Sequence, residues 1–284
     1  MNKINQALSK VVAYLDGWNP WTNVYGWARS LIAICTLITL LFNSSDVMFR
    51  TTTTSLEGIK CEGLAGISLY CLAGQEHLEL ARWASILILM AVISGYYPRF
   101  TAPLHWWAAF SLFASSAIVD GGEVVANNFA LLIAFFAVFD PRRNHWDAPV
   151  MDGWNLRVGW KAFAYIAVIA MRLQASFIYF QAGEKKMAVQ EWVDGTAMYY
   201  WLNSPYIGLP DYLKPLFEGL LLGPTVAIMT WSVIVFELGL AYALFLKKER
   251  WWPLLTLGLI FHFLIAWLMG IVSFGILKSC TWIG

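Results

Sequence analysis

The stretch VYGWARSLIAICTLITLLF at residues 24–42 decides the fold class, because it stays apolar over the length of a membrane-spanning helix. A hydrocarbon core about 30 Å thick needs about 20 such residues per helix. Six more stretches meet this requirement, at about 80–97, 104–119, 123–139, 160–182, 222–246 and 252–277. The sequence therefore predicts an all-α fold, a polytopic integral membrane helical bundle with about seven spans and two long outer segments.

The composition of the chain supports this fold class. Of its 284 residues, 59% are hydrophobic and 13% are charged, and the charged share is about half of the roughly 25% that is usual in soluble domains. The mean hydropathy is +0.59. These values exclude a disordered chain, a nucleic-acid binder and a soluble domain. We expect a single membrane domain over residues 1–284, in contact with membrane lipid.

The distribution of lysine and arginine predicts the orientation of the spans. These residues concentrate in the segments that are cytoplasmic if the N-terminus is inside, which favours an inside N-terminus and an outside C-terminus. Residues 43–79 and 183–221 are then two long outer segments, and long ordered loops tend to be functional. Residues 3–16 form an amphipathic helix that lies flat on the inner leaflet, or an ordinary helix in water.

The cysteines suggest a disulfide on the outer side. Cys61 and Cys71 share the first outer segment, where an extracytoplasmic environment permits a bridge between them. A redox-active pair is the alternative, although nine intervening residues differ from the CxxC spacing of thiol oxidoreductases. Cys35 lies inside the first span and is expected to be a small buried apolar residue. The four histidines do not lie at metal-ligand spacing from the cysteines, so we expect no metal site.

Ionisable residues also fall within the predicted spans, where they are costly and usually paired. Arg172, Glu237 and His262 lie on the fifth, sixth and seventh spans at similar predicted depths. We therefore expect one hydrogen-bonded cluster, in which Arg172 and Glu237 form a neutral pair and which Gln174 and Asn128 can join. Such a cluster is either a structural clamp between helices, or part of a proton path or of the floor of a ligand pocket.

A pair of lysines, Lys185 and Lys186, ends the fifth span. Two adjacent ammonium groups near a low-dielectric boundary disfavour each other's charge, which makes one of them a candidate general base. The alternative is that both side chains extend to the lipid headgroups.

Two motifs resemble a known family. The run RLQASFIYFQAGEKK at residues 172–186, followed by WVDG at 192–195, resembles the membrane domain of vitamin K-dependent γ-glutamyl carboxylases, within the HTTM (horizontally transferred transmembrane) superfamily. The runs Phe236-Glu237-Leu238 and Phe261-His262-Phe263 are similar to that family's acid and Phe-His positions. We expect no counterpart of the carboxylases' large C-terminal domain within residues 1–284. A short HTTM chain of this kind most resembles the SdpB-like (sporulation-delaying protein B) family of bacterial membrane proteins.

The resemblance implies roles for several residues. In the carboxylases, the second lysine of the motif deprotonates vitamin K hydroquinone, which implies that Lys186 is a base and that a reduced quinone, such as menaquinol or a vitamin K hydroquinone-like molecule, is a cofactor. Lys185 would favour its neutral form, and Asn127 and Asn128 would orient the reacting group. An aromatic segment would cover the substrate pocket; its candidate substrate-binding residues are Trp192, Met198, Tyr199 and Trp201.

One position departs from the carboxylase pattern. The carboxylases have a histidine directly after an Asn-Asn pair, whereas Phe129 follows Asn128 here. A phenyl ring can neither carry a proton nor donate a hydrogen bond, which argues against glutamate carboxylation while leaving a lysine base possible.

Three functions therefore remain open at this point. In the first, the protein is an SdpB-like protein of the bacterial cytoplasmic membrane that matures or modifies a secreted precursor peptide to give an antimicrobial toxin. The family resemblance implies a small SdpA-like partner protein for that function. In the second, it is a quinol- and oxygen-dependent oxidoreductase or carboxylase. In the third, it is a non-catalytic scaffold or immunity protein.

Overall fold

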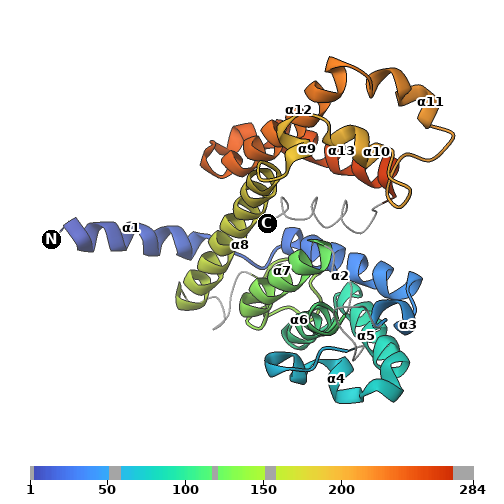
Figure 1. The fold of residues 1–284 in the computed structure, drawn as a ribbon. Coiled ribbons are helices and arrows are strands. Elements are labelled where there is room, and N and C mark those ends of the chain that lie inside the picture. Colours follow the sequence, from blue (N-terminus) through green and yellow to red (C-terminus); the bar gives the residue numbers. More distant parts are fainter. Residues whose placement is uncertain (1–2, 51–58, 117–120, 151–157, 271–284) are drawn as a thin grey trace. The chain divides into compact units, whose positions relative to one another are not determined.

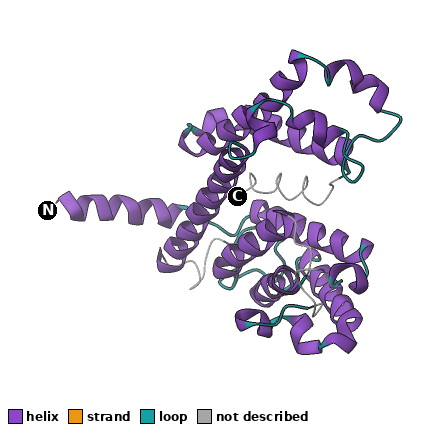
Figure 2. Cartoon of the chain, in the orientation of Figure 1, coloured by secondary structure: helices purple, strands orange, loops and turns teal. Residues whose placement is uncertain are grey.

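The computed structural model describes residues 3–50, 59–116, 121–150 and 158–270. Within these ranges, the chain consists of helices joined by loops and turns, without a strand (Figure 2). The all-α fold that the sequence predicts is therefore confirmed. The described residues fall into two compact units, 3–171 and 172–270, and each is described by itself below.

The first unit is built from five principal helices (Figure 1). These are α1 (Lys3–Gly17), α2 (Asn23–Phe42), α5 (Leu78–Ile93), α6 (Pro98–Ser115) and α7 (Gly121–Ala137). Between α2 and α5 lie the shorter elements α3 (Ser45–Met48), η1 (Gly63–Ile67), α4 (Leu69–Ala73) and η2 (Gln75–His77). Buried side chains such as Leu40, Tyr70, Leu89 and Leu112 form one apolar core among them.

The second unit begins within α8 (Val158–Lys186), a continuous helix whose first part belongs to the first unit. It continues with α9 (Gln190–Val193), α10 (Ala197–Leu202), α11 (Lys214–Phe217), η4 (Glu218–Leu220), α12 (Pro224–Tyr242), η5 (Ala243–Phe245), η6 (Lys248–Arg250) and α13 (Trp251–Met269). A core of Leu202, Leu209, Leu221 and Val226 joins the short helices to α12.

Each predicted span coincides with a helix. Four described helices, α2, α8, α12 and α13, are long and apolar enough to cross a membrane. The other three, α5, α6 and α7, have 16, 18 and 17 residues. Helix α6 begins at Pro98, earlier than predicted, because proline needs no amide partner in a first helical turn. The end of the predicted seventh span, from residue 271 onward, lies outside the described residues.

The structure also tests the predictions for the cysteines and for α1. Cys61 and Cys71 form the predicted disulfide, and Cys35 is buried. On α1, Leu15 is buried at 4% exposure, whereas Ile4 and Leu8 stay exposed, at 72% and 61%. Contact with the inner leaflet, which would cover this face, stays a prediction.

Candidate functional site

An ion pair of the second unit joins Lys186, at the end of α8, to Glu237 of α12. The Lys186 Nζ donates to both carboxylate oxygens of Glu237, at 2.9 and 2.7 Å. It also donates to the carbonyl oxygen of Ala182 at 3.2 Å. The side chains are 21% and 12% exposed, respectively. The pair is thus mostly, but not completely, shielded from the surroundings.

A small residue on α8 makes this contact possible. Gly183 packs against α12 so closely that a Cβ atom there would lie 2.9 Å from Cδ2 of Leu238. One helical turn before Gly183, Tyr179 packs with Leu240 and Ala241. The close approach of α8 and α12 therefore sets Lys186 within reach of Glu237.

An aromatic residue covers the other side of the lysine. The Nζ of Lys186 lies 5.1 Å from the ring centroid of Trp192, on α9. Trp192 is buried and packs with Ala197 and Ile234. A cation over a tryptophan ring is stabilised by the ring quadrupole. The short helix α9 thereby ties the start of the second outer segment to the ion pair.

A second polar contact lies deeper in the same unit. The hydroxyl of Tyr179 is 3.5 Å from Nε2 of His262, and Nδ1 of His262 is 2.7 Å from the carbonyl oxygen of Gly258. Both side chains are only 1% exposed. This contact links α8 to α13, as the Lys186–Glu237 pair links α8 to α12.

The predicted pairing of Arg172 with Glu237 is wrong. The carboxylate of Glu237 is held by Lys186, whereas the guanidinium of Arg172 lies 4.9 Å from the ring centroid of Trp251. Fourteen residues separate Arg172 from Lys186 on α8, which corresponds to about 21 Å along the axis. The prediction assumed that residues at equal depth on different helices lie side by side. The packing of α8 on α12 instead places Glu237 beside Lys186.

The remaining predicted site residues are distributed over both units. Lys185 is exposed, and Gln174 is half-buried on α8. Asn127 and Asn128 belong to α7 of the first unit, where the Asn127 Nδ2 donates to Oδ1 of Asn128 at 3.3 Å. Their joint action with Lys186 stays a prediction.

The predicted substrate-binding residues of α10 differ in their surroundings. The backbone amide of Met198 donates to Oγ1 of Thr230 at 3.2 Å, while Tyr199 and Trp201 are exposed. Tyr199 also lines a cavity of about 370 Å³ in the second outer segment.

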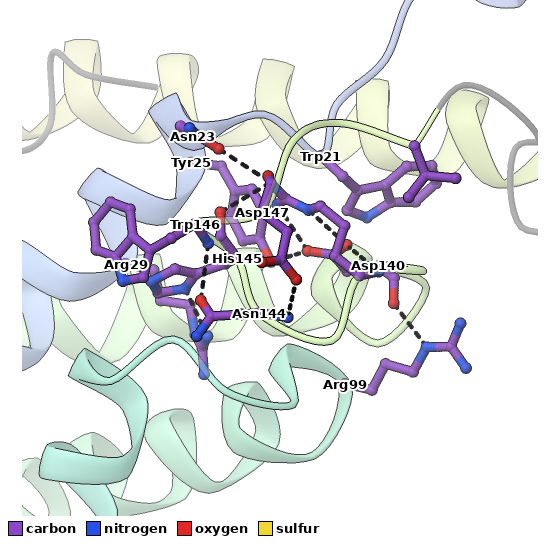
Figure 3. Close-up of polar contacts among 12 residues, drawn as sticks. Trp21, Asn23, Tyr25, Arg29, Arg99, Asp140, Asn144, His145, Trp146 and Asp147 are labelled. Carbon is purple, nitrogen blue, oxygen red and sulfur yellow. Dashed lines mark hydrogen bonds and ion pairs between the residues drawn. The ribbon is translucent and has the colours of Figure 1, made fainter.

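The first unit also contains a buried polar cluster that was not predicted from the sequence (Figure 3). The guanidinium of Arg142 donates to both carboxylate oxygens of Asp140, at 3.0 and 2.9 Å, and the hydroxyl of Tyr25 donates to the same carboxylate at 2.5 Å. The two charged side chains are 0% exposed. Arg142 also donates to the carbonyl oxygens of His145 and Asp147, which holds the loop after α7 together, while the Tyr25 hydroxyl joins this loop to α2.

The same cluster contains a second buried arginine. The NH1 of Arg29, on α2, lies 3.0 Å from Nδ1 of His145, and its NH2 lies 2.5 Å from Oγ1 of Thr101. Burial, reinforced by the charges of Arg29 and Arg142, lowers the pKa of His145 to about 3. His145 is therefore neutral here, and it can accept a hydrogen bond from Arg29.

A glycine allows this loop to approach α5. At Gly95, φ is +83°, and a Cβ atom would lie 2.3 Å from Oδ1 of Asn144. The His145 amide donates to the carbonyl oxygen of Gly95 at 3.0 Å. A group of ionisable residues follows directly after an apolar stretch of the sequence: Asp140, Arg142 and His145. This concentration is the sequence feature that indicates the polar cluster.

Comparison with known proteins identifies the family. The HTTM domain model matches residues 87–281. The chain is 35% identical to the sporulation-delaying protein SdpB of Bacillus subtilis (strain 168) over 272 residues, 95% of this chain and 83% of SdpB. It is 34% identical to the uncharacterized protein YitO of the same organism over 274 residues, 96% of this chain and 87% of YitO. No solved structure gives a significant match. The chain thus belongs to the HTTM family and is an SdpB-like, multi-pass membrane protein.

Proposed function

We propose that this protein takes part in the production of a secreted peptide toxin at the bacterial cytoplasmic membrane, with Lys186 as the general base of its site. The N-terminus is inside and the site faces outward. A secreted precursor peptide is its substrate, and a small SdpA-like protein is its partner. The similarity to SdpB over nearly the whole chain supports the biological role. The contact of Lys186 with Glu237 is the observation that carries the chemical role.

The ion pair supplies the properties that a lysine base needs. The carboxylate of Glu237 lies 2.7 Å from the Lys186 Nζ and can accept one proton of the resting ammonium, which leaves a neutral amine. That amine then accepts a proton from the substrate, and the proton on Glu237 passes to the surroundings, so that the ammonium–carboxylate pair forms again. Glu237 also fixes the amine in one position, which reduces the entropy cost of proton transfer. The partial exposure of both side chains leaves room for a substrate group to approach.

Lys186→Arg is the variant that tests this role. Arginine keeps the positive charge and the contact with Glu237, but it does not lose its proton in proteins. Because general bases contribute about 10²–10⁴-fold to rates, we expect toxin production to fall at least about 100-fold. Production is measured as growth inhibition of an indicator strain and as the amount of mature peptide by mass spectrometry.

Two further variants complete the test. Lys60→Arg changes an exposed lysine of the first outer segment and should leave production at the wild-type level. If Lys186→Arg also keeps it there while the protein level is normal, the base is not Lys186. A scaffold would then be the better description, with Glu237→Ala still reducing the amount of folded protein, because loss of a partner leaves an uncompensated charge.

A quinol- and oxygen-dependent oxidoreductase is the second candidate. An apolar cavity of about 540 Å³ lies along α12 and α13 and includes Phe236, Gly239 and Phe261. Its lining fits the isoprenoid tail of a reduced quinone, and such a quinone would supply an acidic hydroxyl and two electrons. Quinol that copurifies with the protein, and oxygen uptake that Lys186→Arg abolishes, would favour this function over peptide maturation without redox chemistry.

A further inference from the structure

The second outer segment contains a cavity with walls from two short helices. Tyr199 lies on α10 and Asn203 directly after it on one side, and Lys214 and Glu218 lie on α11 and the adjoining η4 on the other. The volume is about 370 Å³. Binding cavities for small ligands span about 300–1,000 Å³, so this one has room for a few amino-acid side chains.

The floor of this cavity is apolar and rigidly held. Leu209 and Leu221 line it and are only 4% and 6% exposed. Both belong to the core that includes Leu202, and the Leu209 amide donates to the carbonyl oxygen of Leu202 at 2.7 Å. The floor therefore presents apolar surface to a ligand, and the core behind it holds this surface in place.

The charges at the rim favour a cationic ligand. The Lys214 Nζ donates to the carboxylate of Asp211 at 2.6 Å, so this lysine already has a counter-ion. Within the described part of the chain, the carboxylate of Glu218 has no such partner. Tyr199 lines the same cavity, and a tyrosine ring can attract a cation through its π-electrons.

The charge of the whole outer segment agrees with this preference. Residues 183–221 contain five acidic and three basic side chains, a net charge of −2, whereas the whole chain has a net charge of +1. Opposite charge around a cavity raises the local concentration of a ligand and its association rate.

We propose that this cavity binds a basic side chain of a peptide, with Glu218 as its counter-ion and the leucine floor in contact with the neighbouring apolar residues. The choice of a peptide as ligand rests on the proposed function. The site itself is separate from the Lys186–Glu237 pair and would hold the peptide, not react with it.

Direct binding tests the proposal. The probe is a fluorescent, N-acetylated and C-amidated Leu-Leu-Lys-Leu-Leu peptide, and the full-length protein is held in phosphatidylcholine nanodiscs. A second probe has norleucine in place of lysine. We expect the lysine probe to bind about fivefold more tightly, because exposed ion pairs contribute up to about that factor. The Glu218→Gln variant should remove the difference.

Matched variants and lipids separate the alternatives. Glu191→Gln removes an exposed carboxylate of the same segment, outside the cavity, and should leave binding of both probes unchanged. Equal binding of the two probes to the wild-type protein would overturn the proposal, as would an equal loss in Glu191→Gln. Displacement of the probe by added phosphatidylethanolamine would show a lipid site instead. Lys186→Arg should still bind the lysine probe, so this result is independent of the test of the base.

Discussion

The buried ion pair of Asp140 and Arg142 gives the sharpest prediction about stability. In Asp140→Asn, the Arg142 guanidinium keeps its position but loses its counter-ion, and Arg29 remains nearby as a second buried cation. Both members of the wild-type pair are 0% exposed, so solvent cannot compensate for the lost carboxylate. Removal of one partner from a buried pair costs about 3–5 kcal/mol.

The expected shift in thermal stability follows from this cost. At about 2–4 °C per kcal/mol for chains of this size, the unfolding midpoint should fall by roughly 6–20 °C. The assay is thermal unfolding of the purified protein in detergent, followed by circular dichroism at 222 nm. The exposed pair of Asp211 with Lys214 is the control, because Asp211→Asn should leave the midpoint unchanged within error.

A double variant separates the ion pair from simple loss of packing. Arg142→Met with Asp140→Asn removes both charges, so it should recover much of the stability that Asp140→Asn loses. A midpoint for Asp140→Asn within 2 °C of wild type would refute the reasoning, because a buried arginine without its carboxylate would then have no measurable cost.

Three more predictions follow from the same contacts. Because the pKa of His145 is lowered to about 3, the folded state binds fewer protons than the unfolded state as the pH drops below about 6.5. The free energy of unfolding should therefore fall, by up to about 1.4 kcal/mol per pH unit. Unfolding curves between pH 7 and 4.5 measure this dependence, and His145→Gln should weaken it. A reductant should lower the unfolding midpoint of the wild type, because the Cys61–Cys71 bridge closes a short loop and contributes about 3 kcal/mol to stability. The reductant should have no effect on Cys61→Ser, and equal shifts in the two proteins would contradict a stabilising bridge. Gly183→Leu should destabilise the protein by about 1–3 kcal/mol through overpacking against Leu238, and Leu238→Ala in the same chain should restore the midpoint measured in thermal unfolding.

Much of the fold could be predicted because it depends on local hydropathy. The apolar run at 24–42 becomes α2 with nearly the same bounds, since a helix satisfies its own backbone hydrogen bonds in lipid. The disulfide also followed from two cysteines that lie ten positions apart in one predicted outer segment.

The pairing of charges could not be predicted from the sequence. Depth counted from the helix ends placed Glu237 beside Arg172, but the contact of Gly183 with Leu238 fixes how α8 lies on α12. That contact depends on side-chain volumes on two helices that are distant from each other in the sequence. The loop after α7 presented the same difficulty, because Asp140 meets Tyr25 only after α2 and α7 have packed.

The Asp140–Arg142 and Lys186–Glu237 pairs differ in exposure, and this difference distinguishes a structural ion pair from a candidate catalytic one. Asp140 and Arg142 have no exposed surface, and Arg142 is bound further by backbone carbonyls; a substrate cannot reach these groups, and a proton that left them would lose several contacts at once. Lys186 is partly exposed and contacts one carboxylate, one backbone carbonyl and one aromatic ring. Its amine can therefore exchange a proton with an approaching group while Glu237 keeps it in place. For this reason we assign the candidate chemistry to Lys186, although the cluster around Asp140 contains more hydrogen bonds.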